Sequence, residues 1–164
     1  MAQTHLLTLN YKGDHKKPDT IYDTQNFLDN ELVGSKTTTW IEVHDPATNN
    51  VVSRVPETTL SECKAAVISA QNAFPAWRDT SIMKRQEMIF KLTNLVRENM
   101  DSLAISIVTE QGKTFADAKG DVLRGLQVCE TACGITTQLP GEVLEVAKDM
   151  ETRSYRLPLG VVAS

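Results

Sequence analysis

Hydrophobic and polar positions follow two different periods along the chain. Near its start, apolar pairs flank Asp29-Asn30 within Phe27–Leu32, and because both central residues tolerate a positive φ, this pattern predicts a hairpin turn. Apolar runs over 40–43 and 51–55, on either side of a turn-rich loop, predict two more strands. The first part of the chain is therefore expected to form a small antiparallel unit.

The middle of the chain carries apolar residues at the three- and four-residue spacing of amphipathic helices. The segment 59–62 (TLSE) matches a capping box, in which a Thr hydroxyl and a Glu carboxylate satisfy free amides at a helix start. A first helix is predicted from this box to Phe74, and Pro75 is expected to end it. A second helix is predicted to begin near Ser81.

Two further helices are predicted after it. The third spans about 101–111, with Gly112 in the stop position. Its expected inward residues are Leu103, Ala104, Ile107 and Val108. The fourth starts at 114–117, and its apolar stripe is predicted to comprise Phe115, Ala118, Val122, Gly125, Cys129, Ala132 and Thr136.

Strand-like alternation returns after the helices. The alternating pattern over 152–157 predicts a strand that faces water on one side, and the apolar pattern over 158–163 predicts the start of a buried strand. The whole pattern predicts an α+β fold with short antiparallel strands, a four-helix region and a terminal strand segment. A polar lead-in over 1–24 is expected to precede one structural unit over 25–164.

Composition narrows the class of protein. With 164 residues, 41% of them apolar, the chain is long enough for one globular domain, and it is too apolar for a disordered tail. Its apolar runs are far shorter than the roughly 20 residues of a membrane span. A net charge of −4 argues against a nucleic-acid partner. The sequence thus predicts a soluble protein with neither a membrane nor a nucleic-acid partner.

Motifs for common chemistries are missing from the sequence. It contains no glycine-rich nucleotide loop, no HExxH, no CxxC and no GxSxG. A basic cluster within 12–17 is expected to be solvated, and His5, His15 and His44 are too scattered to predict a metal site. The odd cysteine count suits a reducing compartment, and Cys129 and Cys133 are expected to be small core residues.

Charged residues near the third and fourth helices offer a few candidates. Glu110 and Lys113 could form an acid–base pair, but the simpler interpretation is that they are charged residues of the kind commonly found at the end of a helix. Asp117 and Asp121 form an i,i+4 carboxylate pair that is expected to be solvated. Arg124 lies between two glycines, where its guanidinium could bind a carboxylate in bidentate fashion; the alternative is an exposed i,i+3 pair with Asp121.

Several motifs, in order and spacing, resemble the N-terminal part of the NAD-dependent aldehyde dehydrogenases. They are FLDNE (27–31), DPAT (45–48), AFPAW (73–77), EQGKT (110–114) and PLGV (158–161). Three longer segments resemble the CoA-acylating methylmalonate-semialdehyde dehydrogenases within that family: PAWRDTS (75–81), GDVLRGLQV (120–128) and SYRLPLGV (154–161).

This resemblance implies an enzyme that oxidises methylmalonate or malonate semialdehyde with NAD, decarboxylates it and passes the acyl group to CoA. It implies that Arg124 binds the substrate carboxylate, and it matches no residue here to the catalytic nucleophile, the cofactor site or a metal site. The resemblance covers about the first third of such an enzyme, with the Rossmann domain truncated. This chain alone is therefore expected to be inactive, with apolar helix faces exposed.

The resemblance also implies a homotetramer that acts on a small-molecule semialdehyde in valine and pyrimidine catabolism. The family is mitochondrial in eukaryotes, but residues 1–30 contain no Arg and four Asp, so no transit peptide is visible and the cytoplasm is the alternative. A second hypothesis of function is a non-catalytic interaction module, whose terminal hairpin pairs with full-length subunits.

Overall fold

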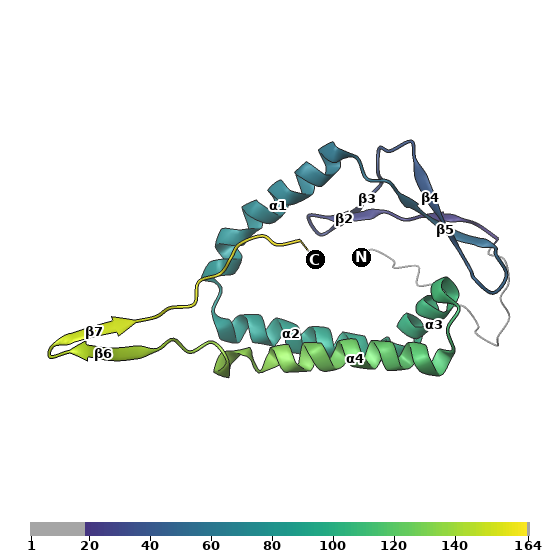
Figure 1. The fold of residues 1–164 in the computed structure, drawn as a ribbon. Helices are drawn as coiled ribbons and strands as arrows, with labels where there is room; N and C mark the ends of the chain where they lie inside the picture. The colour runs from purple at the N-terminus through teal and green to yellow at the C-terminus, as the bar shows by residue number, and fades with distance from the viewer. Residues whose placement is uncertain (1–18, 164) are drawn as a thin grey trace.

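The computed structural model describes residues 19–163, so the basic cluster within 12–17, His5 and His15 lie outside the described residues. Short strands come first, four helices follow, and then come a hairpin and an extended segment that runs back past α1 (Figure 1). The first strands are β1 (Tyr22–Asp23), β2 (Asn26–Leu28), β3 (Glu31–Val33), β4 (Trp40–His44) and β5 (Val51–Pro56). The helices are α1 (Leu60–Asp79), α2 (Ile82–Glu98), α3 (Met100–Gln111) and α4 (Phe115–Cys133), followed by the 3₁₀ turn η1 (Ile135–Thr137) and the strands β6 (Val143–Ala147) and β7 (Met150–Arg153).

The first strands form two small sheets. The β2–β3 hairpin turns at Asp29 and Asn30, both with a positive φ, as the sequence predicts. The strands β4 and β5 pair antiparallel, but β1 runs parallel to β5, so the expectation of a purely antiparallel unit is wrong at this edge. The Arg54 guanidinium donates two hydrogen bonds to the Asp23 carboxylate, at 2.7 and 3.0 Å, and these bonds help to hold β1 in that direction.

Helix α1 begins as its sequence predicts but ends later. The capping box is present: Thr59 Oγ1 accepts a hydrogen bond from the Glu62 amide, and the Glu62 carboxylate accepts one from the Thr59 amide. The prediction that Pro75 ends the helix is wrong, because α1 continues to Asp79. Proline removes the amide that would bond the Gln71 carbonyl, and since α1 has no buried residue, water can take its place.

The core lies where α2, α3 and α4 pack together. Figure 1 shows α2 and α4 side by side, with α3 at one end of the pair and the β6–β7 hairpin projecting from the other. The buried core cluster comprises Ala104, Val108, Ala118 and Val122, and Val96, Met100, Ile107 and Phe115 pack against it. None of the helices within residues 19–163 is both long and apolar enough to cross a membrane.

The structure corrects two details of the predicted apolar stripes. On α4, Leu126 and Cys133 are buried, whereas the predicted Gly125 and Ala132 are exposed. On α3, Leu103 is exposed instead of inward. On α4 the covered face lies one residue later than predicted at these two positions, because the neighbouring helices select which face is covered. On α3 the predicted Ala104 and Val108 are buried, so the covered stripe there is narrower than expected.

The C-terminal strands differ from the prediction. The strand expected over 152–157 is β7, Met150–Arg153, and its antiparallel partner β6 was not predicted. The strand expected over 158–163 does not form, because the three sheets of the described residues leave it without a neighbour.

Large apolar side chains are exposed on several elements, as expected for helix faces that lack cover. Every residue of β6 and β7 is exposed, including Val143, Leu144 and Met150. On α1 the exposed set includes Leu60, Val67, Ile68 and Trp77, and on α2 it includes Met83, Phe90 and Leu95. Exposed apolar surface of this kind is typical of faces that pack against another part of a protein.

Candidate functional site

Three charged side chains meet in the first half of α4. The Asp121 carboxylate accepts a hydrogen bond from Lys113 Nζ at Oδ2 and another from Arg124 Nη2 at Oδ1. The exposed fraction of the side chain is 28% for Asp121, 32% for Lys113 and 71% for Arg124. The hydrogen bond from Lys113 is the main cause that lowers the pKa of Asp121 below its ordinary value, and Arg124 adds to it. We call these three residues the charge cluster.

The backbone on both sides of Lys113 fixes its place. Gly112 caps the end of α3 with a φ of 71°, and its amide donates a hydrogen bond to the Val108 carbonyl. Thr114 caps the start of α4, where its hydroxyl accepts a hydrogen bond from the Asp117 amide. Lys113 is therefore the single residue between two helix caps.

Glycines make room at both ends of the charge cluster. A Cβ added at Gly112 would lie 3.2 Å from Pro46 Cβ, so this turn packs closely against the β4–β5 loop. A Cβ added at Gly120 would lie 3.8 Å from Arg124 Nη1, and one added at Gly125 would meet nothing within 4 Å. The Arg124 guanidinium thus lies beside a small residue on an open part of the helix surface.

The structure separates the candidates that the sequence offered. The i,i+3 pair between Asp121 and Arg124 is present. The prediction that Asp121 is solvated is wrong, since both of its oxygens are paired, and Asp117 instead accepts a hydrogen bond from the Thr114 hydroxyl at 2.7 Å. The contact between Lys113 and Asp121 was not predicted. The sequence does contain a signal for this contact: a C-cap Gly and an N-cap Thr on either side of Lys113 place Lys113 beside the start of α4.

The other polar candidates lie apart from this chemistry. Glu110 is exposed, Cys63 is exposed, and Cys133 is buried as expected for a core residue, with Cys129 half-buried. The His44 ring approaches Glu42 at 3.4 Å and the Asn49 carbonyl at 3.2 Å. Within residues 19–163, no three His, Cys, Asp or Glu residues are grouped to hold a metal ion.

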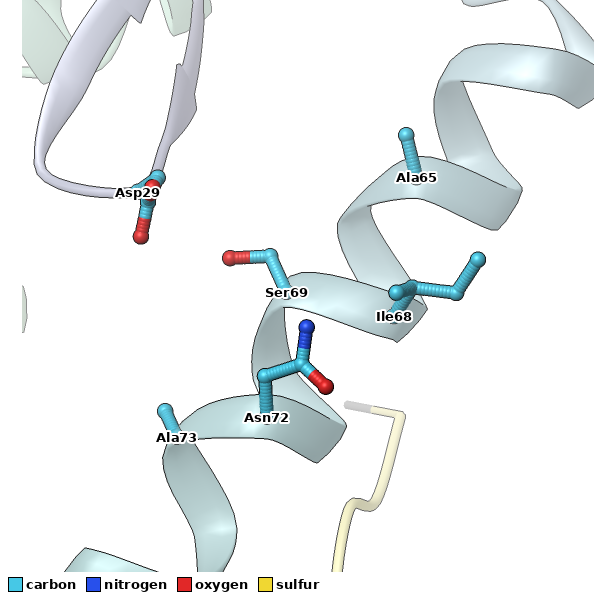
Figure 2. A pocket seen from close by; sticks show the side chains of 6 residues that line it. All are labelled: Asp29, Ala65, Ile68, Ser69, Asn72 and Ala73. Carbon is cyan, nitrogen blue, oxygen red and sulfur yellow. The ribbon is translucent and has the colours of Figure 1, made fainter.

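A hollow of about 540 Å³ separates the β2–β3 turn from α1 (Figure 2). In Figure 2, the Ser69 hydroxyl points from α1 toward Asp29. The residues that line the hollow are Asp29, Ala65, Ile68, Ser69, Asn72 and Ala73. This lining includes no cation, histidine or cysteine, so it offers neither an anion site nor a nucleophile with a base.

The charge cluster, unlike this hollow, contains charged side chains that could recognise an anion. Two cations share one anion there, which leaves a net charge of +1. Within the described residues, Arg124 is held through one nitrogen, Nη2. A guanidinium with free N–H groups can bind a carboxylate through two parallel hydrogen bonds, which is a geometry that lysine does not offer.

Comparisons with known proteins agree on a family. The family model "Aldehyde dehydrogenase family" matches residues 32–164. The chain is 52% identical over 138 residues to the methylmalonate-semialdehyde/malonate-semialdehyde dehydrogenase [acylating], mitochondrial, of Rattus norvegicus, and 50% identical over 138 residues to that of Homo sapiens. Each match covers 84% of this chain and 26% of the relative, so the chain spans about a quarter of the length of these relatives.

Solved structures give the same result. A candidate methylmalonate-semialdehyde dehydrogenase from Sinorhizobium meliloti 1021, complexed with NAD, superposes with a TM-score of 0.84 at 33% identity, over 87% of this chain and 29% of that one. The methylmalonate-semialdehyde dehydrogenase of Oceanimonas doudoroffii superposes with a TM-score of 0.80 at 28% identity, over 85% and 28%. The order of strands and helices described above is thus that of one part of a larger known fold, and the chain belongs to the aldehyde dehydrogenase family.

Proposed function

We propose that this chain supplies the carboxylate-binding arginine of a CoA-acylating methylmalonate/malonate-semialdehyde dehydrogenase. The observation that carries this proposal is the Arg124 guanidinium, which is mostly exposed on α4 and held by one nitrogen. A semialdehyde with a carboxylate at its far end needs a cation to fix that end while its aldehyde reacts. Arg124 orients the substrate in this way and distinguishes it from aldehydes that have no second charge.

The residues of this chain do not fit NAD. A dinucleotide needs a glycine-rich turn and free amides at a helix N-terminus. No such turn occurs in the sequence, and the N-terminal amides of α1, α2 and α4 are capped by Thr59, Ser81 and Thr114. No residue here matches the nucleophilic cysteine of the family either. We therefore expect no NAD reduction by these 164 residues alone.

We further propose the molecular setting of this activity. Residues 25–164 form the N-terminal portion of an aldehyde dehydrogenase domain, preceded by the polar lead-in over 1–24. The assembly is a homotetramer, which is consistent with the exposed apolar residues of β6 and β7. We place the protein in the mitochondrion because the rat and human relatives are named mitochondrial, with the cytoplasm as the alternative.

A chimera tests the proposed activity. Residues 25–164 replace the matching segment of the rat relative, and NAD reduction is followed with methylmalonate semialdehyde in the presence and absence of CoA. We expect CoA-dependent formation of propionyl-CoA by the chimera and no turnover by the 164-residue chain. A soluble, tetrameric chimera that oxidises neutral aldehydes but not the semialdehyde would contradict the proposal.

One observation favours a second candidate function. The β6–β7 hairpin projects from the helices, and each of its two strands has an edge with no partner among the described residues (Figure 1). Such an edge can pair with a strand of another chain. A non-catalytic module would then join full-length subunits through this hairpin. Co-purification of the chain with the rat relative, lost when Leu144 and Val146 are changed to Lys, would support it.

A further inference from the structure

We propose that Lys113 keeps the Arg124 guanidinium available to a carboxylate ligand by holding one oxygen of Asp121. This inference rests on the proposed function of Arg124 and adds a second residue to it. Lys113 acts through Asp121, so it is a positioning residue. Its position between the caps Gly112 and Thr114 places the ammonium group beside α4.

The geometry of the shared carboxylate carries this inference. Arginine and a carboxylate pair most strongly when two N–H groups meet two oxygens. Lys113 occupies Asp121 Oδ2, so Asp121 engages Arg124 only through Oδ1 and Nη2. Without Lys113, both oxygens of Asp121 would be free to close a bidentate pair with Arg124. That intramolecular pair would compete directly with a carboxylate ligand.

The net charge of the charge cluster supports the same inference. With Lys113 the charge cluster has a net charge of +1, and without it the charge is zero. The neighbouring cation Lys119 is paired elsewhere: it contacts Asp101 at 2.6 Å and lies over the Phe115 ring at 5.5 Å. Asp121 and Lys113 are both largely covered, so salt screens their attraction less than it screens a fully exposed pair.

A double-mutant cycle tests the inference. The full 164-residue chain is titrated with malonate, and binding is followed by NMR shifts of the arginine side chains, with chloride used to hold the ionic strength constant. We expect K113M to raise the Kd for malonate about two- to fivefold, the range of a partly exposed ion pair. K113R should stay within about twofold of the wild type. In the D121N background, the effect of K113M should be smaller than in the wild type, because the competing carboxylate has gone and only the charge of Lys113 is lost.

Each other outcome overturns the inference. An unchanged Kd in K113M, or the same loss in both backgrounds, would show that Lys113 does not act through Asp121. If R124M abolishes binding while the Lys113 variants leave it intact, only this inference fails. If the wild-type chain binds no malonate, or R124M binds it as well as the wild type, the proposed role of Arg124 fails too. Circular dichroism of each variant verifies that it is folded.

Discussion

Two leucines on α4 provide a matched test of where the core lies. Leu126 is 3% exposed and Leu123, one turn earlier on the same helix, is 45% exposed. Changing either one to Ala removes the same atoms and gives the same gain in helix propensity. Any difference between the two variants in the free energy of unfolding therefore reports burial.

The expected size of that difference follows from burial. Leu→Ala removes about three methylene equivalents, worth about 0.8 kcal/mol each when buried, or about 2.4 kcal/mol. A residual cavity adds to this cost, to the extent that neighbouring side chains do not move to fill it. We expect about 3 kcal/mol for L126A and less than about 1 kcal/mol for L123A.

Urea unfolding followed by circular dichroism measures both variants against the wild type. With equal m-values, the midpoint shifts convert directly into free energies of unfolding. Equal losses in L126A and L123A, or a larger loss in L123A, would refute the assignment of the buried face of α4. The predicted stripe with Gly125 in place of Leu126 would then regain support.

Three further predictions follow from local features. The Thr59 hydroxyl, assisted by backbone amides, lowers the pKa of Glu62 from 4.5 to about 2, so the ionised Glu62 stabilises the fold above pH 4.5 and this stabilisation is lost as the pH falls toward 2. The unfolding midpoints of the wild type and E62Q should therefore converge between pH 4.5 and 2. A difference between these midpoints that stays constant with pH would contradict this. G112A should lower the free energy of unfolding by about 1–2 kcal/mol, because the backbone φ at Gly112 is 71°. G125A should instead raise it by about 0.5–1 kcal/mol, because alanine favours the helix more than glycine does. Equal shifts of the melting temperature in the two variants would contradict the left-handed cap at Gly112. The exposed apolar residues of β6, β7 and α1 should make the chain associate with increasing concentration in light scattering, and a monomer at all concentrations would contradict this.

Features that depend on a few adjacent residues were predictable from the sequence. The turn at Asp29-Asn30, the capping box at 59–62 and the stop at Gly112 all appear where expected. In each case the backbone conformation or the capping partner lies within three residues, so no distant part of the fold is needed to specify it.

Features that depend on neighbours in space were missed. The choice between Leu126 and Gly125 is made by the helices that α4 packs against, and Pro75 is tolerated because α1 has little packing around it. The strand β6 is exposed throughout, so its sequence gives no clean alternation and only its pairing with β7 defines it. The charge cluster follows the same rule: its i,i+3 pair was foreseen, whereas the contact from Lys113 reaches Asp121 on α4 from the turn between α3 and α4.

The role of Arg124 is tested most directly by the substrate selectivity of the chimera. KM is measured for methylmalonate semialdehyde and for propanal, which has no carboxylate, in the R124M and R124K variants. Loss of a charge-assisted pair predicts a KM for the semialdehyde that is about ten- to a hundredfold higher in R124M, a partial recovery in R124K, and an unchanged KM for propanal. Equal changes for both aldehydes, or no change for either, would contradict a carboxylate-binding role for Arg124.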